Sequence, residues 1–140
     1  MCEVVADEMK GPRLIYQNED FVAIAPWASV YNFEFWILPK RHSPSIRYAE
    51  ALEIDELAIA MRLSLGGLSR MLHDPPYNLG FHIAPPSMRY RHYHWHIEVY
   101  PKLGSMGGFE LSTGMYINTM PPERAAEALR EAVTQEKIYL

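Results

Sequence analysis

The sequence contains very little cysteine, with Cys2 as the one thiol in 140 residues. This excludes a disulfide framework, and we interpret the thiol beside the first methionine as incidental. A reducing, intracellular compartment fits such a composition. The chain also lacks a hydrophobic run long enough to cross a membrane, and its start, Met1-Cys2-Glu3, lacks the basic region of a signal peptide. The sequence therefore predicts a cytoplasmic protein.

An excess of positive charge is missing too. The formal net charge is -4, which argues against a nucleic acid as the main partner. Basic residues still cluster locally, at Lys40-Arg41-His42 and at Arg89 and Arg91. A pocket for a small anionic ligand and a solvated basic surface are both compatible with these clusters.

Internal repeats, low-complexity tracts and linkers are also absent, so residues 1–140 are predicted to form one domain. With 49% hydrophobic residues, a chain of this length can bury a core of its own. Runs of strands flanking two helices indicate an α+β fold. Strands are predicted at Phe21–Ala25, Phe33–Leu38, Tyr77–Ala84, His92–Val99 and Phe109–Asn118, the first two as an antiparallel hairpin, and helices at Ile54–Leu72 and Pro121–Ala132.

The most informative stretch is a ladder in which His92, His94, His96 and Glu98 recur at every second position. Alternate residues of a strand share one face, so this pattern predicts a polar, titratable face opposite the aromatic and aliphatic residues in between. Neighbours on such a face lie roughly 6.5–7 Å apart. One metal ion can therefore contact at most two of them, and its other ligands must come from another strand or loop.

One interpretation of the ladder is nucleophilic catalysis. An imidazole attacks the α-phosphorus of a nucleotide or nucleotide sugar, and a second acceptor resolves the nucleotidyl-histidine. His94 is then the catalytic candidate, with His92 and His96 orienting it or contacting phosphate oxygens. A polar strand without catalytic function is the competing interpretation.

A second interpretation is metal binding. His96 and Glu98 form an adjacent chelating pair, and His82 arrives from the preceding predicted strand. Two imidazoles and one carboxylate suit zinc or iron and leave a position open for water or another ligand. Against this, a single histidine such as His82 is often just a core or edge residue.

A basic turn follows the strand that ends at Pro39. Lys40, Arg41 and His42 are candidates for phosphate binding, or for capping the strand and pairing with acids at residues 50–55. Glu34, a carboxylate inside an apolar strand, needs a polar partner.

Two motifs in order, Pro39-Lys40-x-His42 and His92-x-His94-x-His96, resemble the histidine-triad superfamily of nucleotide hydrolases and transferases. The resemblance covers most of the chain from about residue 14. Within the superfamily the chain is most similar to the second half of the galactose-1-phosphate uridylyltransferases. The shared elements are Phe33-Glu34, Gly80-Phe81-His82-x-Ala84-Pro85, Tyr100-Pro101, Gly107-Gly108-Phe109-Glu110 and Pro122-Glu123-x-Ala125-Ala126.

The resemblance implies an antiparallel sheet of about five strands flanked by two helices, and a pairing of two such units. It therefore implies a homodimer or a separately encoded N-terminal-half partner. It implies a nucleotidyltransferase or hydrolase acting on a nucleotide sugar or nucleotide phosphate. His82, His96 and Glu98 would hold a divalent metal, zinc or iron, and Glu110 and Asn118 would lie near sugar hydroxyls.

The chain departs from the family at informative positions. His94 occupies the place of the histidine-triad nucleophile, where the bacterial transferase's second half has glutamine, and Glu98 replaces a histidine of that enzyme. The His-Pro-His-x-Gln motif of the first half is missing. Two hypotheses remain: an enzyme in which His94 attacks phosphorus, or a non-catalytic partner subunit that binds metal and sugar phosphate.

Overall fold

A single antiparallel sheet organises the computed structural model, which describes residues 1–86 and 92–139. The basic residues Arg89 and Arg91 lie outside the described residues. The strands are β1 (Leu14–Gln17), β2 (Phe21–Ile24), β3 (Phe35–Pro39), β4 (Tyr77–His82) and β5 (His96–Pro101), in the order β1-β2-β3-β5-β4. The predicted α+β class and the β2–β3 hairpin are confirmed.

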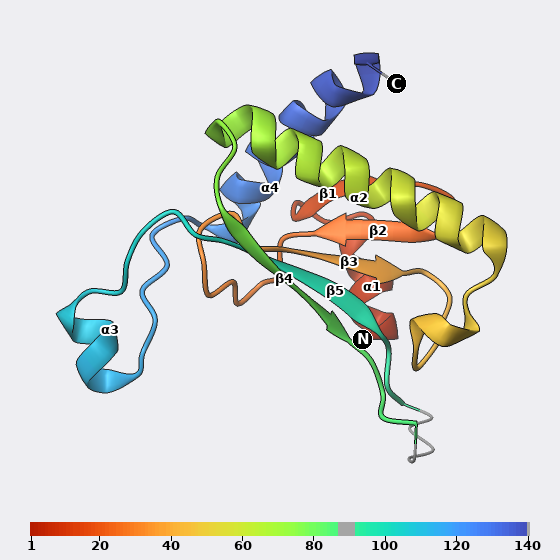
Figure 1. Ribbon diagram of the computed structural model, residues 1–140, viewed down its shortest axis with the longest axis horizontal. Helices are drawn as coiled ribbons and strands as arrows, with labels where there is room; N and C mark the ends of the chain where they lie inside the picture. The colour runs from red at the N-terminus through yellow and green to blue at the C-terminus, as the bar shows by residue number, and fades with distance from the viewer. Residues whose placement is uncertain (87–91, 140) are drawn as a thin grey trace.

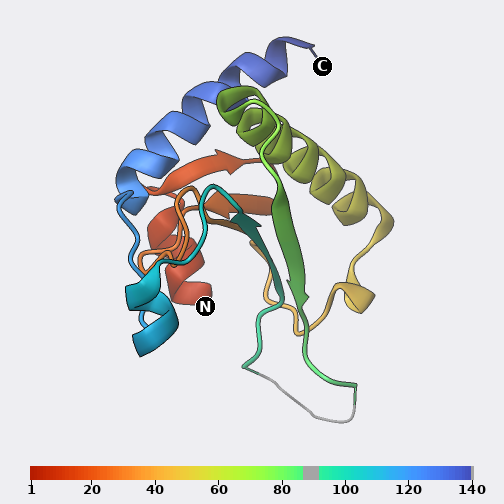
Figure 2. The same cartoon turned by 60° about the vertical axis from the view of Figure 1, so that its left-hand side comes forward.

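Helices cover the sheet unevenly (Figures 1 and 2). Two long helices, α2 (Ala51–Leu72) and α4 (Pro122–Glu136), pack on each other and on the β1–β2 side. The short α1 (Cys2–Glu8) packs on the other face of the sheet. The segment between β5 and α4, residues 102–121, forms an arm that projects away from the body and contains α3 (Gly108–Thr113). Two 3-10 turns, η1 (Ile46–Tyr48) and η2 (Lys137–Tyr139), complete the elements.

The alternation of strand side chains produces two hydrophobic cores. Phe21 and Ala23 of β2 face the large core under α2 and α4. Val22 and Ile24, the alternate residues, face a smaller cluster that is closed by Val5 of α1. Because β2 is buried on both faces, this half of the sheet is fixed firmly and α1 is held against the face that carries the polar residues.

The two glycines in the middle of α2 allow a close helix crossing. A Cβ at Gly67 would come within 2.9 Å of Val133 Cγ2 and 3.0 Å of its backbone nitrogen, both on α4. A Cβ at Gly66 would meet the side chain of Glu136 instead. The cost of glycine inside a helix is therefore offset at Gly67 by helix packing.

The predicted strand at His92–Val99 is too long, because β5 begins only at His96. Before that point Trp95 donates its N–H to the carbonyl of Ser43, outside the sheet. His94 and Trp95 are both buried, with 2% and 1% of their surface exposed. His92 and His94 therefore lie outside the strand, and the predicted alternation holds only from His96 onward.

The strand predicted at Phe109–Asn118 is wrong, since residues 108–113 form α3. The Glu110 carboxylate accepts the N–H of Gly107 at 3.0 Å and caps the helix start, and Gly114 ends it with a φ of 70°. The sequence also failed to predict α1 and β1. Among the described residues, none of the helices is both long and apolar enough to span a membrane.

Candidate functional site

The structure brings His82, His96 and Glu98 together. His82 pairs with His96 across β4 and β5, and the two rings stack with centroids 4.9 Å apart. Glu98 Oε1 lies 3.0 Å from His96 Nε2, and Glu98 Oε2 lies 3.5 Å from His82 Nε2. The set thus has two neighbours from one strand and a third ligand from the next, as the spacing argument requires.

The hydrogen bonds of His96 favour a cation at this position. Its Nδ1 lies 3.0 Å from the carbonyl oxygen of His94, so Nδ1 carries the proton. Its Nε2 then faces an acceptor, the Glu98 carboxylate. With Nδ1 protonated, the Nε2 lone pair and the carboxylate face each other and would share a metal ion. The donor set of two imidazoles and a carboxylate fits such an ion.

Tyr100 completes this cluster on the same strand. Its hydroxyl donates to Glu98 Oε2 and lies 3.4 Å from His82 Nε2. Burial and the bond to the Glu98 carboxylate raise the pKa of the Tyr100 phenol, so the hydroxyl keeps its proton and stays a donor. Tyr100 therefore fixes the second carboxylate oxygen in the way that outer-shell residues orient metal ligands.

A second cluster lies where α1 meets the end of β3. Cys2 Sγ is 3.2 Å from His42 Nδ1 and 3.5 Å from His94 Nδ1. The three ligand atoms lie within 4.8 Å of one another, so Cys2, His42 and His94 also form a set able to hold a metal. The sequence interpretation gave Cys2 no role, whereas folding of α1 places its thiol against two predicted site residues.

The two nitrogens of His94 have different roles. Nε2 lies 2.7 Å from the carbonyl oxygen of Pro39 and donates its proton there. Nδ1 therefore carries the lone pair, and it is covered by Cys2. Burial lowers the pKa of His94, and the nearby His42 acts in the same direction. The ring is held neutral, with Nδ1 as its single nucleophilic or metal-binding atom.

The structure does not bring His92 beside His94. His92 lies in an exposed turn ahead of β5. In the described part of the chain no hydrogen bond or ring contact joins the two, because the strand that would have aligned them starts four residues later.

The basic turn is engaged in structural contacts. Lys40 donates to the carbonyl of Asn18. Arg41 forms a bidentate pair with Glu53, at 2.7 and 2.6 Å, and also contacts the carbonyl of Tyr48. The carboxylate of Glu34 accepts from two backbone N–H groups and from Trp36 Nε1, which supplies the partners it needed.

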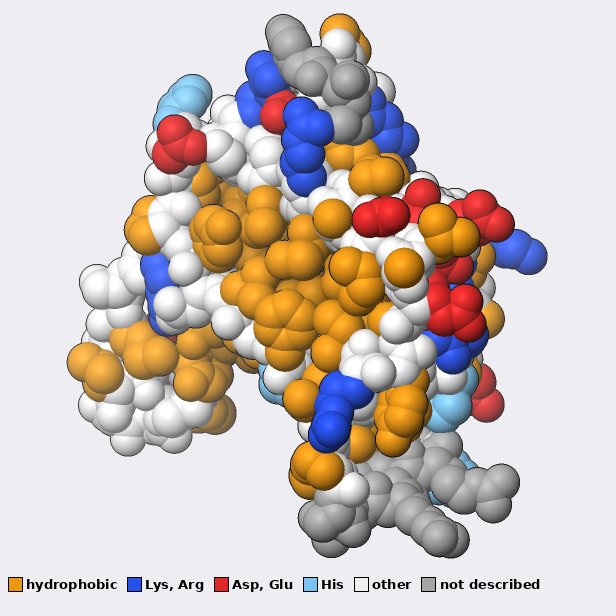
Figure 3. Space-filling model, turned by 45° about the vertical axis from the view of Figure 1, so that its right-hand side comes forward, with side chains coloured by type: hydrophobic (Ala, Val, Ile, Leu, Met, Phe, Trp, Pro, Cys, Tyr) orange, Lys and Arg blue, Asp and Glu red, His pale blue; other side chains and the backbone are white. Residues whose placement is uncertain are grey.

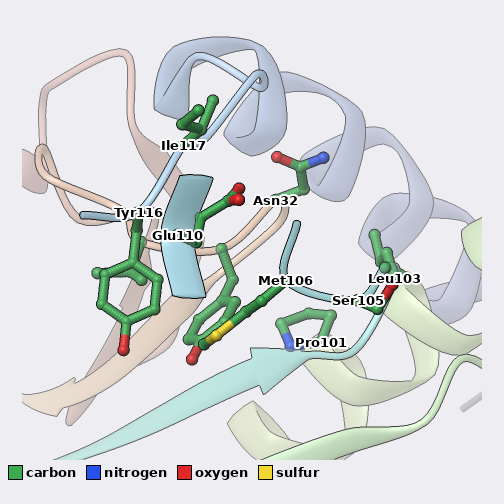
Figure 4. Close-up of a pocket in the computed structure, with 11 residues that line it drawn as sticks. Asn32, Pro101, Leu103, Ser105, Met106, Glu110, Tyr116 and Ile117 are labelled. Carbon is green, nitrogen blue, oxygen red and sulfur yellow. The ribbon is translucent and has the colours of Figure 1, made fainter. Parts of the chain in front are cut away.

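Two neighbouring cavities lie between the β2–β3 connection and the projecting arm. One, of about 370 Å³, is lined by Glu98, Tyr100 and Lys102 together with residues of the β2–β3 connection. The other, of about 170 Å³, is shown in Figure 4, where Glu110, Tyr116 and Asn32 surround it. Val30, Tyr31 and Tyr116 line both. Glu110 thus reaches a cavity, whereas Asn118 ties the arm to the carbonyls of Ser29 and Tyr31.

Sequence reasoning missed Cys2, Tyr31, Tyr100 and Lys102. The signal for two of them was present: Tyr100 and Lys102 continue the spacing of two beyond Glu98. For Cys2 and Tyr31 there was none, because both reach the site through long-range contacts.

No protein-family model matches the chain, whereas individual known proteins are similar to it. An ADP-glucose phosphorylase from Arabidopsis thaliana is 36% identical over 121 residues, 84% of this chain and 34% of that protein. A crystal structure of an ADP-glucose phosphorylase from Arabidopsis thaliana with bound ADP-glucose superposes with a TM-score of 0.83, at 34% identity, over 93% of this chain and 42% of that one. A galactose-1-phosphate uridylyltransferase from Thermotoga maritima is 30% identical over 140 residues, 94% of this chain and 44% of that protein.

The fold is that of the histidine-triad proteins. A zinc-bound histidine triad family protein from Mycobacterium smegmatis superposes with a TM-score of 0.68 over 99% of this chain and 95% of that one, and at 19% identity this likeness shows the fold alone. Within that class, the resemblance to the galactose-1-phosphate uridylyltransferases and their phosphorylase relatives is confirmed. The chain spans between a third and a half of the length of these relatives, 34% and 44%.

Proposed function

We propose that this chain takes part in nucleotidyl transfer on a nucleotide sugar. The observation that carries the proposal is the cavity beside Glu98, which joins the ligand set of His82, His96 and Glu98 to a space of sugar size. Similarity along most of the chain to an ADP-glucose phosphorylase and a galactose-1-phosphate uridylyltransferase supports the reaction class. When bound, a divalent metal there supplies positive charge for phosphate oxygens.

The proposed nucleophile is His94, acting through Nδ1. The Nδ1 lone pair forms a bond to the α-phosphorus, the bond from phosphorus to the sugar-phosphate oxygen breaks, and the sugar 1-phosphate leaves. An incoming phosphate oxygen then takes the nucleotidyl group from the histidine. Pro39 orients the ring, and Cys2 must move aside, because its thiol covers Nδ1. His92 keeps its proposed role at the phosphate, from the exposed turn.

A second role for the same residues is compatible with the spacing of Cys2, His42 and His94, although the similarity to known enzymes does not favour it. A metal held by these three atoms occupies the Nδ1 lone pair of His94. The two roles exclude each other, since a nitrogen with one lone pair cannot bind a metal and attack phosphorus at once. In the second case the nucleophile comes from a partner, and this chain is the metal- and sugar-phosphate-binding subunit.

Covalent trapping separates the two roles. The purified protein is incubated with ADP-glucose or UDP-glucose labelled in the α-phosphate, and acid-labile label on the protein is measured. We expect label in the wild type and none in His94→Gly. Label that persists in His94→Gly removes His94 as nucleophile. Absence of label in a wild type shown to bind the nucleotide sugar contradicts catalysis by this chain alone.

A partner unit is proposed along β4. This strand is one of the two edges of the sheet, and its side chains Tyr77 and Phe81 are 45% and 49% exposed. Figure 3 shows hydrophobic side chains gathered across one face of the molecule. An unpaired edge beside apolar surface is a pairing site. A second copy and a separately encoded first half are the two candidates. We keep the cytoplasm as the proposed compartment.

Molar mass in solution tests the partner. A homodimer predicts twice the chain mass by light scattering and a monomer for Phe81→Asp. If the wild type is monomeric at high concentration, a second copy is excluded, and the separately encoded first half is left as the candidate.

A further inference from the structure

The polar face of β5 does not end with Glu98. His96, Glu98 and Tyr100 alternate along the strand, and Lys102 follows at the same spacing. The N–H of Lys102 donates to the carbonyl of Pro76 at 2.7 Å, so the pairing with the β4 side extends one residue past the strand. Lys102 is therefore held in register with the candidate metal ligands.

The ammonium group of Lys102 rests on an aromatic surface. Its Nζ lies 4.9 Å from the centre of the Tyr31 ring. That ring contacts Tyr100 and Tyr116 edge-on, at 5.8 and 5.9 Å between centroids. Such a contact positions a cation without neutralising it. Among the described residues no carboxylate forms an ion pair with Lys102.

Among the described residues, Lys102 is the one lysine or arginine that lines either of the two neighbouring cavities. It lines the larger cavity together with Glu98. Lys40 and Arg41, the cations expected from sequence to bind phosphate, are committed to Asn18 and Glu53. Asn78 and Gly80, opposite Tyr100 and Glu98 on β4, add little bulk to this face.

We propose that Lys102 binds the phosphate group of the substrate, with Tyr31 as its positioning residue. The ligand chemistry is a phosphate dianion, carried by a sugar 1-phosphate or free in solution. By strand spacing, Glu98 and Lys102 are roughly 13–14 Å apart at their Cα atoms. A ligand of sugar-phosphate size can therefore contact both side chains. The inference rests on the proposed function, because it names the residue that holds the phosphate at that site.

Calorimetric titration with glucose 1-phosphate and with inorganic phosphate tests the proposal. We expect Lys102→Met to weaken binding of both by about tenfold or more, as for a lost charge-assisted hydrogen bond. Lys102→Arg should keep most of the affinity. Added salt should weaken binding to the wild type more than binding to Lys102→Met, which a merely structural lysine does not predict. Tyr31→Leu should weaken binding more than Tyr31→Phe, which keeps the ring.

Lys137→Met is the matched control. Lys137 lies 4.8 Å over the ring of Tyr16, in the same kind of contact but away from both cavities, so its loss should leave phosphate binding unchanged. Equal affinity of Lys102→Met and the wild type overturns the inference while the proposed function stands. Wild-type binding of inorganic phosphate through Lys102, without binding of glucose 1-phosphate, keeps the inference and contradicts the sugar-phosphate part of the function. No binding of either probe to the wild type contradicts both.

Discussion

The two sides of the sheet differ in how they are covered. On the β1–β2–β3 side every residue of β2 is buried, with helices on both faces. On the β5–β4 side no residue of β4 is fully buried, and the polar face of β5 opens into a cavity. The difference teaches that one side of the sheet is buried on both faces, which stabilises the fold. The other side leaves β4 uncovered and gives a ligand access to Glu98 through the cavity.

The largest expected effect comes from one substitution made on each side. Phe35 on β3 is 0% exposed and Phe81 on β4 is 49% exposed. Phe35→Ala should lower the free energy of unfolding by about 3–5 kcal/mol, which can unfold a domain of ordinary stability. In the monomeric chain, Phe81→Ala should cost less than about 1 kcal/mol. Urea denaturation of both variants measures the difference.

Equal losses of unfolding free energy from Phe35→Ala and Phe81→Ala would contradict the difference in coverage between the two sides of the sheet. They would mean that the β4 face is covered in solution, by a second copy of the chain or another partner. Repeating the Phe81→Ala measurement at several protein concentrations distinguishes a dimer, because its apparent stability rises with concentration.

Metal binding by His82, His96 and Glu98 should depend on the open side of the sheet. Removing a ligand with His96→Ala should lower the affinity for Zn²⁺ at the His82 cluster by about a hundredfold or more, since even outer-shell changes cost 10–100-fold. Tyr100→Phe should cost less, because it frees Glu98 without removing a ligand. His73→Asn is the control, since asparagine tolerates the left-handed backbone of that helix end. Unchanged zinc content in His96→Ala would remove His96 as a ligand.

Substitutions at the crossing of α2 and α4, on the covered side, should have an intermediate effect on stability. Gly67→Ala places a methyl group against Val133, including its backbone, and should destabilise the fold by about 1–3 kcal/mol. Gly66→Ala meets only the flexible side chain of Glu136, and the higher helix propensity of alanine should offset much of the clash. Thermal unfolding of the pair measures this. A Gly66→Ala loss as large as that of Gly67→Ala would contradict the packing argument.

Sequence reasoning predicted the parts of the fold in which local pattern and tertiary contacts agree. The apolar period of α2 and the β2–β3 hairpin are examples, and both are present. It failed where a local contact overrides composition. The side chain of Glu110 and the backbone of Gly114 turn a strand-like sequence into α3.

The candidate site shows the same division. The grouping of His82, His96 and Glu98 followed from strand spacing, because β4 and β5 pair in the register that sets His82 opposite His96. The contact of Cys2 with His42 and His94 could not be predicted, since it spans 40 and 92 residues and depends on where α1 packs. No local periodicity encodes such a contact.

The smallest expected effect concerns Arg41, on the covered side of the comparison. Its guanidinium pairs with Glu53, and 52% of the Arg41 side chain is exposed, so Arg41→Met should cost only about 0.2–1 kcal/mol at pH 7. The bond to Arg41 lowers the pKa of Glu53. A lowered pKa stabilises the fold above the ordinary pKa of the carboxyl group and loses that contribution as the pH falls through the lowered value. The gap between wild type and Arg41→Met should therefore close on acidification below pH 4.5, the ordinary value for this group. The affinity for phosphate should be the same in Arg41→Met as in the wild type. A weaker affinity would mean that Arg41 binds the substrate phosphate.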